Sequence, residues 1–211
     1  MFVHHLSMMW KGASVAIIGG GPSLVEKDVR LCRVSGCRTI GVNDAYKFGN
    51  NIDITFFGDA EWYYGTAHHP GHAQAVQQWP GMRITCDPRL QREAGLICLQ
   101  KHEGEGIMDF PRLKWYRNSG ASAIALAVML GASRIYLLGF DGMKRKGQHN
   151  WHEDNVHDIP EATYLKHQNQ MATLAEDVRR YPYNNNATIW NCTPCSAYNC
   201  FIEAELPEVL A

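Results

Sequence analysis

The sequence predicts an α/β protein built on a Rossmann-like, mostly parallel sheet with helices on both faces. Short apolar runs rich in β-branched residues recur at 14–18, 38–42, 52–57 and 134–139, as expected of strands buried on both faces. Helical segments are expected between these runs, and strands that alternate with helices imply right-handed crossovers between parallel strands. Glycine, Asn or Asp stands directly after each run or one residue beyond it, and these residues are typical of the turn after a strand.

The remaining elements are predicted in chain order. A helix is expected from Ser23 onward, and 82–86 and 95–99 predict two short strands beyond a polar, histidine-containing stretch at 62–79. The clearest helix is 119–130, an almost unbroken run of Ala, Ile, Leu and Val, with Asn118 or Ser119 as its N-cap and Gly131 at its end. A polar loop at 142–160, a helix over about 161–181 and a last strand at 187–191 follow.

Composition limits the class of protein and its partners. The 211 residues are 45% hydrophobic and 19% charged, as in ordinary globular chains, and no repeat or linker divides them, so 1–211 is expected to be one domain. A net charge of −1 gives no strong nucleic-acid signal. The absence of a signal peptide and of a run of about 18 apolar residues predicts a cytoplasmic protein without a membrane span. The sequence leaves a homo-oligomer open.

Polar residues follow four of the predicted strands. In a parallel sheet these strand ends lie along one edge, which is where open α/β sheets bind their ligands. The residues are Gly19 to Ser23 after the first strand, Asn43 and Asp44 after the second, Gly58 and Asp59 after the third, and Phe140 and Asp141 after the strand at 134–139.

The turn after the first strand is predicted to hold a phosphate. Glycines at 20 and 21 let the backbone approach an anion, the expected helix after Pro22 adds its positive end, and Ser23 adds a hydroxyl donor. The alternative is a tight turn without a ligand. The pattern is not G-x-G-x-x-G, because Leu24 stands where the third glycine belongs, and this disfavours a dinucleotide-dependent dehydrogenase.

Other polar residues at this edge are candidates for the same ligand. Asn43 and Asp44 are suited to a ribose hydroxyl or a base edge, although they also suit a turn cap. Ser119 and Gly120 place a second helix N-terminus there, which simple N-capping also explains. Asp59 and Asp141 are candidates to hold Mg²⁺ or to act as a base, because both roles suit a carboxylate. The alternative is that they cap loops.

The loop at 142–160 is the second concentration of chemistry. Its stretch 148–158 holds three histidines and three carboxylates, which suit a general base or metal ligands. The spacing of His149 and His152 is no recognised zinc pattern, so we expect a lid that brings one histidine to the substrate, with no metal site. Cys192 and Cys195 are read as structural thiols, and all seven cysteines are expected to be reduced.

Taken together, these segments resemble the family 42 glycosyltransferases, bacterial sialyltransferases that use CMP-sialic acid. The resemblance spans most of 15–201, and its first half is shared with the MptE-like family of 6-hydroxymethylpterin pyrophosphokinases and with small bacteriophage proteins. The segments that carry it are GGGPSL at 19–24, Val42-Asn43, Ser119-Gly120 before an Ala-rich helix, RIYLLGFD at 134–141 and NCTPCSAYNCF at 191–201.

This resemblance implies a function and site residues. It implies nucleotide binding by Gly20, Gly21, Pro22, Ser23, Asn43, Ser119 and Gly120. It also implies a histidine in the later lid; His152 is our first choice, with His149 and His157 in the same region. The family's phosphate-stabilising tyrosine is absent, since Gly142 and Met143 stand there.

The function expected is therefore a glycosyltransferase that uses a nucleotide-activated sugar such as a CMP-sugar. A lid histidine would deprotonate the acceptor, and Arg145 or Lys146 would help to stabilise the leaving phosphate. Two alternatives stay open. One is pyrophosphokinase-type transfer from ATP, with Mg²⁺ held by Asp59 and Asp141. The other is a non-catalytic, phage-type protein that binds or sequesters a nucleotide.

Overall fold

The computed structural model describes residues 3–65, 71–107, 109–152, 159–180 and 187–210. Its centre is an eight-stranded sheet in the order β10-β9-β8-β1-β2-β3-β4-β5, and every neighbouring pair is parallel. The strands are β1 (Ser14–Ile18), β2 (Arg38–Val42), β3 (Ile54–Phe57), β4 (Met82–Thr85), β5 (Leu96–Cys98), β8 (Arg134–Leu138), β9 (Thr188–Asn191) and β10 (Ile202–Glu203). The predicted α/β class is confirmed.

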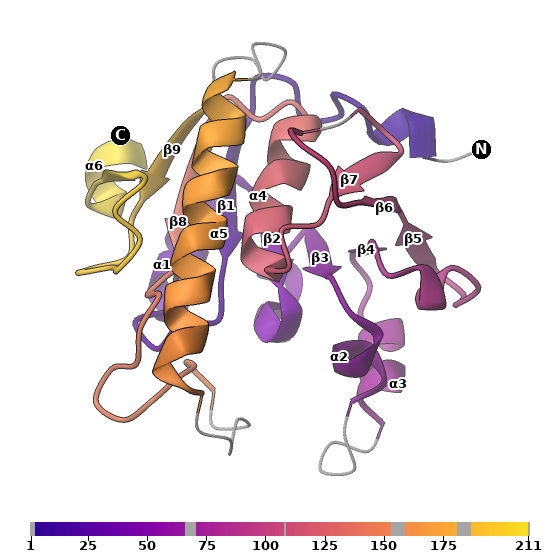
Figure 1. Ribbon diagram of the computed structural model, residues 1–211, viewed down its shortest axis with the longest axis horizontal. Helices are drawn as coiled ribbons and strands as arrows, with labels where there is room; N and C mark the ends of the chain where they lie inside the picture. Colours follow the sequence, from indigo (N-terminus) through magenta and orange to yellow (C-terminus); the bar gives the residue numbers. More distant parts are fainter. Residues whose placement is uncertain (1–2, 66–70, 108, 153–158, 181–186, 211) are drawn as a thin grey trace.

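Helices cover both faces of the sheet (Figure 1). α4 (Ser119–Met129) and α5 (Glu161–Arg180) lie side by side on one face, and α1 (Glu26–Val34) lies on the other. Shorter elements complete the chain: η1 (Val3–Leu6), η2 (Asn43–Asn51), α2 (Ala60–Tyr64), α3 (His72–Gln78), η3 (Pro88–Leu90), α6 (Leu206–Leu210) and a separate parallel pair, β6 (Gln100–His102) with β7 (Arg112–Lys114).

Two hydrophobic cores, one on each face, hold the three layers together. α4 is buried from Gly120 to Met129, as its unbroken apolar sequence predicts, and it packs over β1, β2 and β3. On the opposite face, Val29 and Cys32 of α1 pack with residues of η2, α2, α3 and α6. The central strands are therefore buried on both sides, and this is why they are apolar throughout rather than alternating.

Some elements differ from the prediction. The helix expected from Ser23 begins at Glu26, because the chain is still extended at Val25 (φ −124°, ψ 141°). The polar stretch 62–79, for which no helix was predicted, contains the last residues of α2 and all of α3. The pair β6 and β7, the edge strand β10 and α6 were not predicted, and each is only two to five residues long.

The order of the strands places a crevice between β1 and β8. From β1 the chain builds outward through β2, β3, β4 and β5, and it returns to the other side of β1 for β8, β9 and β10. The connections therefore leave in opposite directions at this point, and such a switch point opens a crevice at the carboxyl ends of the strands. The fold thus places the first glycine turn beside the end of β8.

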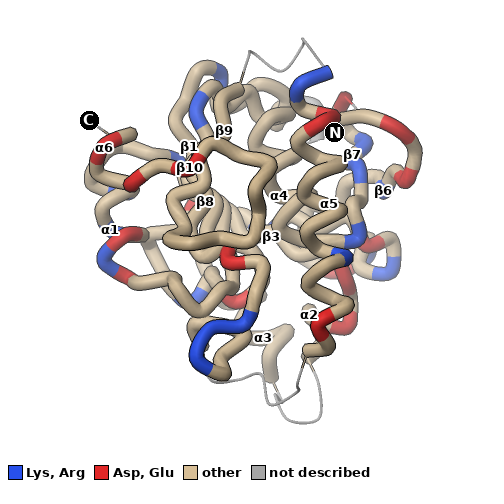
Figure 2. The backbone as a smooth tube through the Cα atoms, turned by 60° about the vertical axis from the view of Figure 1, so that its left-hand side comes forward, with Lys and Arg blue, Asp and Glu red and all other residues tan. Residues whose placement is uncertain are grey.

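The surface and the helices add two observations. Figure 2 shows basic and acidic segments interspersed along the visible backbone, in keeping with the net charge of −1. Among the helices that the structure describes, none combines the length and the apolar character needed to cross a membrane.

Candidate functional site

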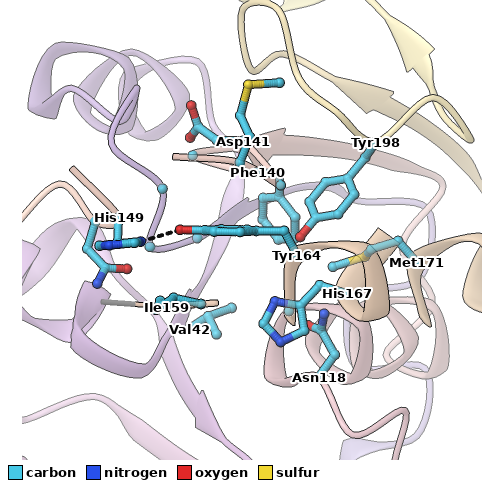
Figure 3. Close-up of a pocket in the computed structure, with 18 residues that line it drawn as sticks. Val42, Asn118, Phe140, Asp141, His149, Ile159, Tyr164, His167, Met171 and Tyr198 are labelled. Carbon is cyan, nitrogen blue, oxygen red and sulfur yellow. Dashed lines mark hydrogen bonds between the residues drawn. The ribbon is translucent and has the colours of Figure 1, made fainter. Parts of the chain in front are cut away.

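A pocket occupies the crevice between the ends of β1 and β8 (Figure 3). Its volume is about 170 Å³. It is lined by the glycine turn, the segment after β8, the start of α4 and the first half of α5, and also by Val42, the lid residues His149 and Asn150, Ile159 and Tyr198. Of the predicted site residues, Gly20, Gly21, Gly120, Asp141 and His149 line this pocket.

The glycine turn is shaped by its contact with the end of β8. The Gly19 and Gly21 amides donate to the carbonyls of Leu138 and Gly139, both at 2.8 Å. A Cβ on Gly21 would lie 2.0 Å from the Asp141 carboxylate and 2.6 Å from the Gly139 carbonyl. Glycine is required here because two turns meet backbone to backbone, and a bound ligand is not needed to explain it.

Ser23 is engaged by a carboxylate of the protein itself. Its hydroxyl donates to Asp141 Oδ2 at 2.8 Å, and its amide donates to the same oxygen at 3.3 Å. Arg145 forms an ion pair with Asp141 and also donates to the carbonyls of Pro194 and Cys195. The donors expected to hold a phosphate at Ser23 thus bind Asp141, and the guanidinium of Arg145 is committed to protein acceptors.

The segment after β9 holds the end of β8 in place. Thr193 accepts a 2.8 Å hydrogen bond from the Phe140 amide, and Ser196 donates to the Phe140 carbonyl at 2.6 Å. The Ala197 amide donates to the Asp141 carbonyl at 2.8 Å. The Thr-Pro-Cys-Ser motif is therefore structural. Burial raises the pKa of Cys192 to about 12, and all seven cysteines are free thiols, as predicted.

The N-terminus of α4 points its positive end at the pocket. Asn118 caps the helix, its side-chain oxygen accepting the Ala121 amide at 3.1 Å. Asn118 and Gly120 line the pocket, whereas Ser119 is half-buried beside it. An eleven-residue helix end with orphan amides is a suitable place for an anion. The second helix N-terminus expected at this edge is thus the one that reaches the pocket.

Asn43 and Asp44 begin η2, directly after β2. Asn43 adopts a left-handed conformation (φ 53°), and its side-chain oxygen is buried with no hydrogen-bond partner among the described residues. Val42, just before it, lines the pocket. An unpartnered buried amide oxygen is costly, and a bound ligand is one way to satisfy it.

Asp44 lies outside the pocket and joins four segments of the chain. Its carboxylate accepts from Trp62 Nε1 at 3.1 Å and lies 3.1 Å from Lys47, 3.8 Å from His72 and 3.7 Å from His152. Burial opposes ionisation of Asp44, but the hydrogen bonds from His72 and Trp62 outweigh it and lower the pKa. Asp44 therefore acts as a docking point for the lid, through His152.

Asp59 caps a helix, as the second reading of this residue predicted. Its carboxylate accepts the Trp62 amide at 2.9 Å and so begins α2. The other candidate magnesium ligand, Asp141, is bound by Ser23 and Arg145. Within the described part of the chain, no group of three His, Cys, Asp or Glu side chains could hold a metal ion.

The lid histidines have different surroundings. His149 lines the pocket, stacks on Tyr164 with ring centroids 6.0 Å apart, and is hydrogen-bonded to the Tyr164 hydroxyl (Figure 3). His152 faces Asp44 instead. Between them, Trp151 packs on Phe48 and donates its amide to the Gly20 carbonyl at 3.1 Å. The lid therefore crosses the glycine turn. His157 and all three carboxylates of the loop lie outside the described residues.

Sequence reasoning missed the wall that α5 contributes. Tyr164, His167 and Met171 follow one another at helical spacing and face the pocket, opposite Tyr198 (Figure 3). Burial lowers the pKa of His167, with a further contribution from Lys166, which favours a neutral imidazole. Burial also raises the pKa of Tyr198. In the sequence this stripe is indistinguishable from one that packs in a core.

Comparison with known proteins shows the fold. The chain is similar to two structures of the sialyltransferase CstII from Campylobacter jejuni, one with the substrate analogue CMP-3FNeuAc and one with cytidine-5'-monophosphate. The identities are 15% and 17%, the TM-scores 0.54 and 0.55, and in both cases 92% of this chain and 86% of the other are covered. No family model and no curated protein sequence matches the chain.

Proposed function

We propose that this protein is a glycosyltransferase that uses a nucleotide-activated sugar, with a CMP-sugar as the candidate donor. The observation that carries the proposal is the pocket at the switch point, where the N-terminus of α4, the glycine turn and a lid histidine meet. The similarity in fold to a sialyltransferase crystallised with CMP ligands supports it.

In this proposal the donor phosphate binds at the N-terminus of α4, beside Asn118 and Gly120. The backbone amides at the start of α4 form the positive end of the helix dipole, and this positive end favours a bound phosphate. Gly20 leaves the pocket wall without a side chain, Gly21 lets the turn pack against Asp141, and Ser23, which follows Pro22, holds the turn through Asp141. The buried oxygen of Asn43 would accept a hydrogen bond from the base or the ribose.

His149 is the proposed general base. It lies in the pocket, and its bond to Tyr164 fixes the imidazole. The acceptor hydroxyl would lose its proton to His149 as its oxygen attacks the anomeric carbon, and the bond from that carbon to the phosphate oxygen would break, releasing the nucleotide. His152, the first choice from the sequence, is instead proposed to hold the lid through Asp44.

The lid must open for a nucleotide-sugar to enter. The pocket has a volume of about 170 Å³, whereas small-molecule sites are commonly roughly 300–1,000 Å³. Asn150 lines the pocket and Trp151 is bonded across the turn, so the segment around them closes the site. The alternative of ATP-dependent pyrophosphoryl transfer has no comparable support, because Asp59 and Asp141 have separate protein partners.

Matched histidine variants test the catalytic assignment. The assay is hydrolysis of a panel of CMP-activated sugars, with water as acceptor. We expect His149→Ala to lower kcat by about 10²- to 10⁴-fold and to leave CMP affinity nearly unchanged. His152→Ala should alter the affinity more than kcat, because it loosens the lid. Retained turnover in His149→Ala together with lost turnover in His152→Ala would contradict the assignment.

A further inference from the structure

A second cavity, of about 800 Å³, adjoins the nucleotide pocket. It lies between the segment after β8 and the first turns of α5. The two cavities share four wall residues, Gly142, Met143, Ile159 and Tyr164. The larger space thus adjoins the pocket along one wall, and the expected nucleotide and lid chemistry does not account for it.

α5 presents one side to each cavity. Tyr164, His167 and Met171 face the first pocket, while Ala162, Leu165 and Gln168, at the same helical spacing, face the second. Tyr164 belongs to both, and its hydroxyl is bonded to His149 on the pocket side (Figure 3). A hydroxyl group presented at this shared wall would therefore lie next to Tyr164, whose own hydroxyl is bonded to the proposed base.

The walls of the second cavity combine apolar and polar surface in similar amounts. Met143, Ile159, Pro160, Ala162 and Leu165 supply carbon surface, and the Leu165 residue is 59% exposed. The polar lining side chains are Lys144, Glu161 and Gln168. Gln168 donates to the Gly142 carbonyl at 3.2 Å and ties α5 to the segment after β8. Carbon-rich side chains beside a small number of polar groups are the usual lining of a small-molecule site.

We propose that this cavity is the acceptor site and that it takes a glycoside carrying an alkyl or aryl group. The apolar group would lie against Leu165 and Ala162, and the reacting sugar hydroxyl would face the shared wall at Tyr164. This inference rests on the proposed glycosyltransferase function. A glycoside with an apolar group suits this site because the cavity adjoins the nucleotide pocket and its lining combines carbon-rich side chains with polar ones.

The test measures binding of paired methyl and octyl β-glycosides of galactose, glucose and N-acetylglucosamine, each below its micelle concentration, to the protein saturated with CMP. We expect at least one octyl glycoside to bind roughly tenfold or more tightly than its methyl counterpart. That ratio corresponds to about 1.4 kcal/mol, within reach of burying a few methylene groups. Equal affinity within every pair, or no binding by any glycoside, would overturn the proposal.

Two variants locate the site. Leu165→Glu places a charge in the cavity and Ala162→Trp fills it; both positions are exposed, so folding should be retained. Each should weaken octyl glycoside binding about tenfold while leaving CMP affinity unchanged. Val34→Glu is the matched control, since Val34 is 81% exposed on α1. Octyl binding unaffected by both cavity variants would overturn the site. If the unaltered protein does not bind CMP, the proposed function itself is rejected.

Discussion

Asp141 links three parts of the candidate site. Its carboxylate, almost completely buried, receives both donors of Ser23 and pairs with Arg145, which in turn holds the segment after β9. Gly21 has no room for a side chain because this carboxylate lies against it. The Asp141 carboxylate thus accepts the hydrogen bonds from Ser23 that the sequence analysis assigned to a bound phosphate.

Removal of this carboxylate should destabilise the fold. Asp141→Ala leaves the half-buried Ser23 donors and the Arg145 guanidinium without their acceptor, and we expect a loss of about 2–4 kcal/mol in the free energy of unfolding, measured by urea denaturation. Asp109→Ala, at an exposed position, is the control and should cost much less. Equal effects of the two substitutions would show that Asp141 does not hold the turn.

At the scale of elements, Asp44 joins η2 to α2, α3 and the lid. The groups that face its carboxylate are Lys47 from η2, Trp62 from α2, His72 from α3 and His152 from the lid. His72 also bonds the Tyr63 carbonyl through Nδ1 at 3.1 Å. The hydrogen bond to Asp44 raises the pKa of His72 against the opposing effect of burial.

This arrangement predicts a pH-dependent contribution to stability. A raised folded pKa means that His72 stabilises the fold below its unfolded pKa of about 6.5 and that this contribution is lost as the pH rises through the folded pKa. Asp44, with a lowered pKa, contributes above about pH 3.9 and loses its contribution as the pH falls through its folded value. The pair should therefore contribute most between roughly pH 4 and 6.5.

The measurement is the free energy of unfolding of the protein and of His72→Gln between about pH 5 and 9. We expect the difference between the two proteins to shrink as the pH rises. His5→Gln, at an exposed position, should give a curve parallel to that of the unaltered protein. A difference that stays constant across the range would mean that His72 and Asp44 do not form a charged pair.

The predictability of each element from sequence follows from what stabilises it. Central strands and α4 are buried on nearly all sides, and their continuous apolar runs identify them. α2, α3, β6, β7 and β10 are short, and contacts with the rest of the molecule position them, so their local sequence carries little signal. The late start of α1 depends on the turn before it, which Asp141 holds from 118 residues away.

For the whole molecule, the parallel sheet brings the four predicted strand ends to one edge. The pocket at that edge could be anticipated from the glycine turn, Asp141 and Gly120 together, because a parallel topology requires them to meet. The pocket wall from α5 could not be anticipated, because Tyr164 and His167 come to line the pocket only through the packing of α5 beside α4.

The central claim is that the pocket between β1 and β8 binds a nucleotide, and a thermal-unfolding screen against CMP, CDP, UDP, ADP, ATP and GTP tests it most directly. A ligand present at 100 times its Kd stabilises the folded protein by about 2.7 kcal/mol, which is readily measured as a rise in Tm. The account predicts a rise with CMP that persists in EDTA. Unchanged Tm with all six nucleotides, with and without Mg²⁺, would contradict it.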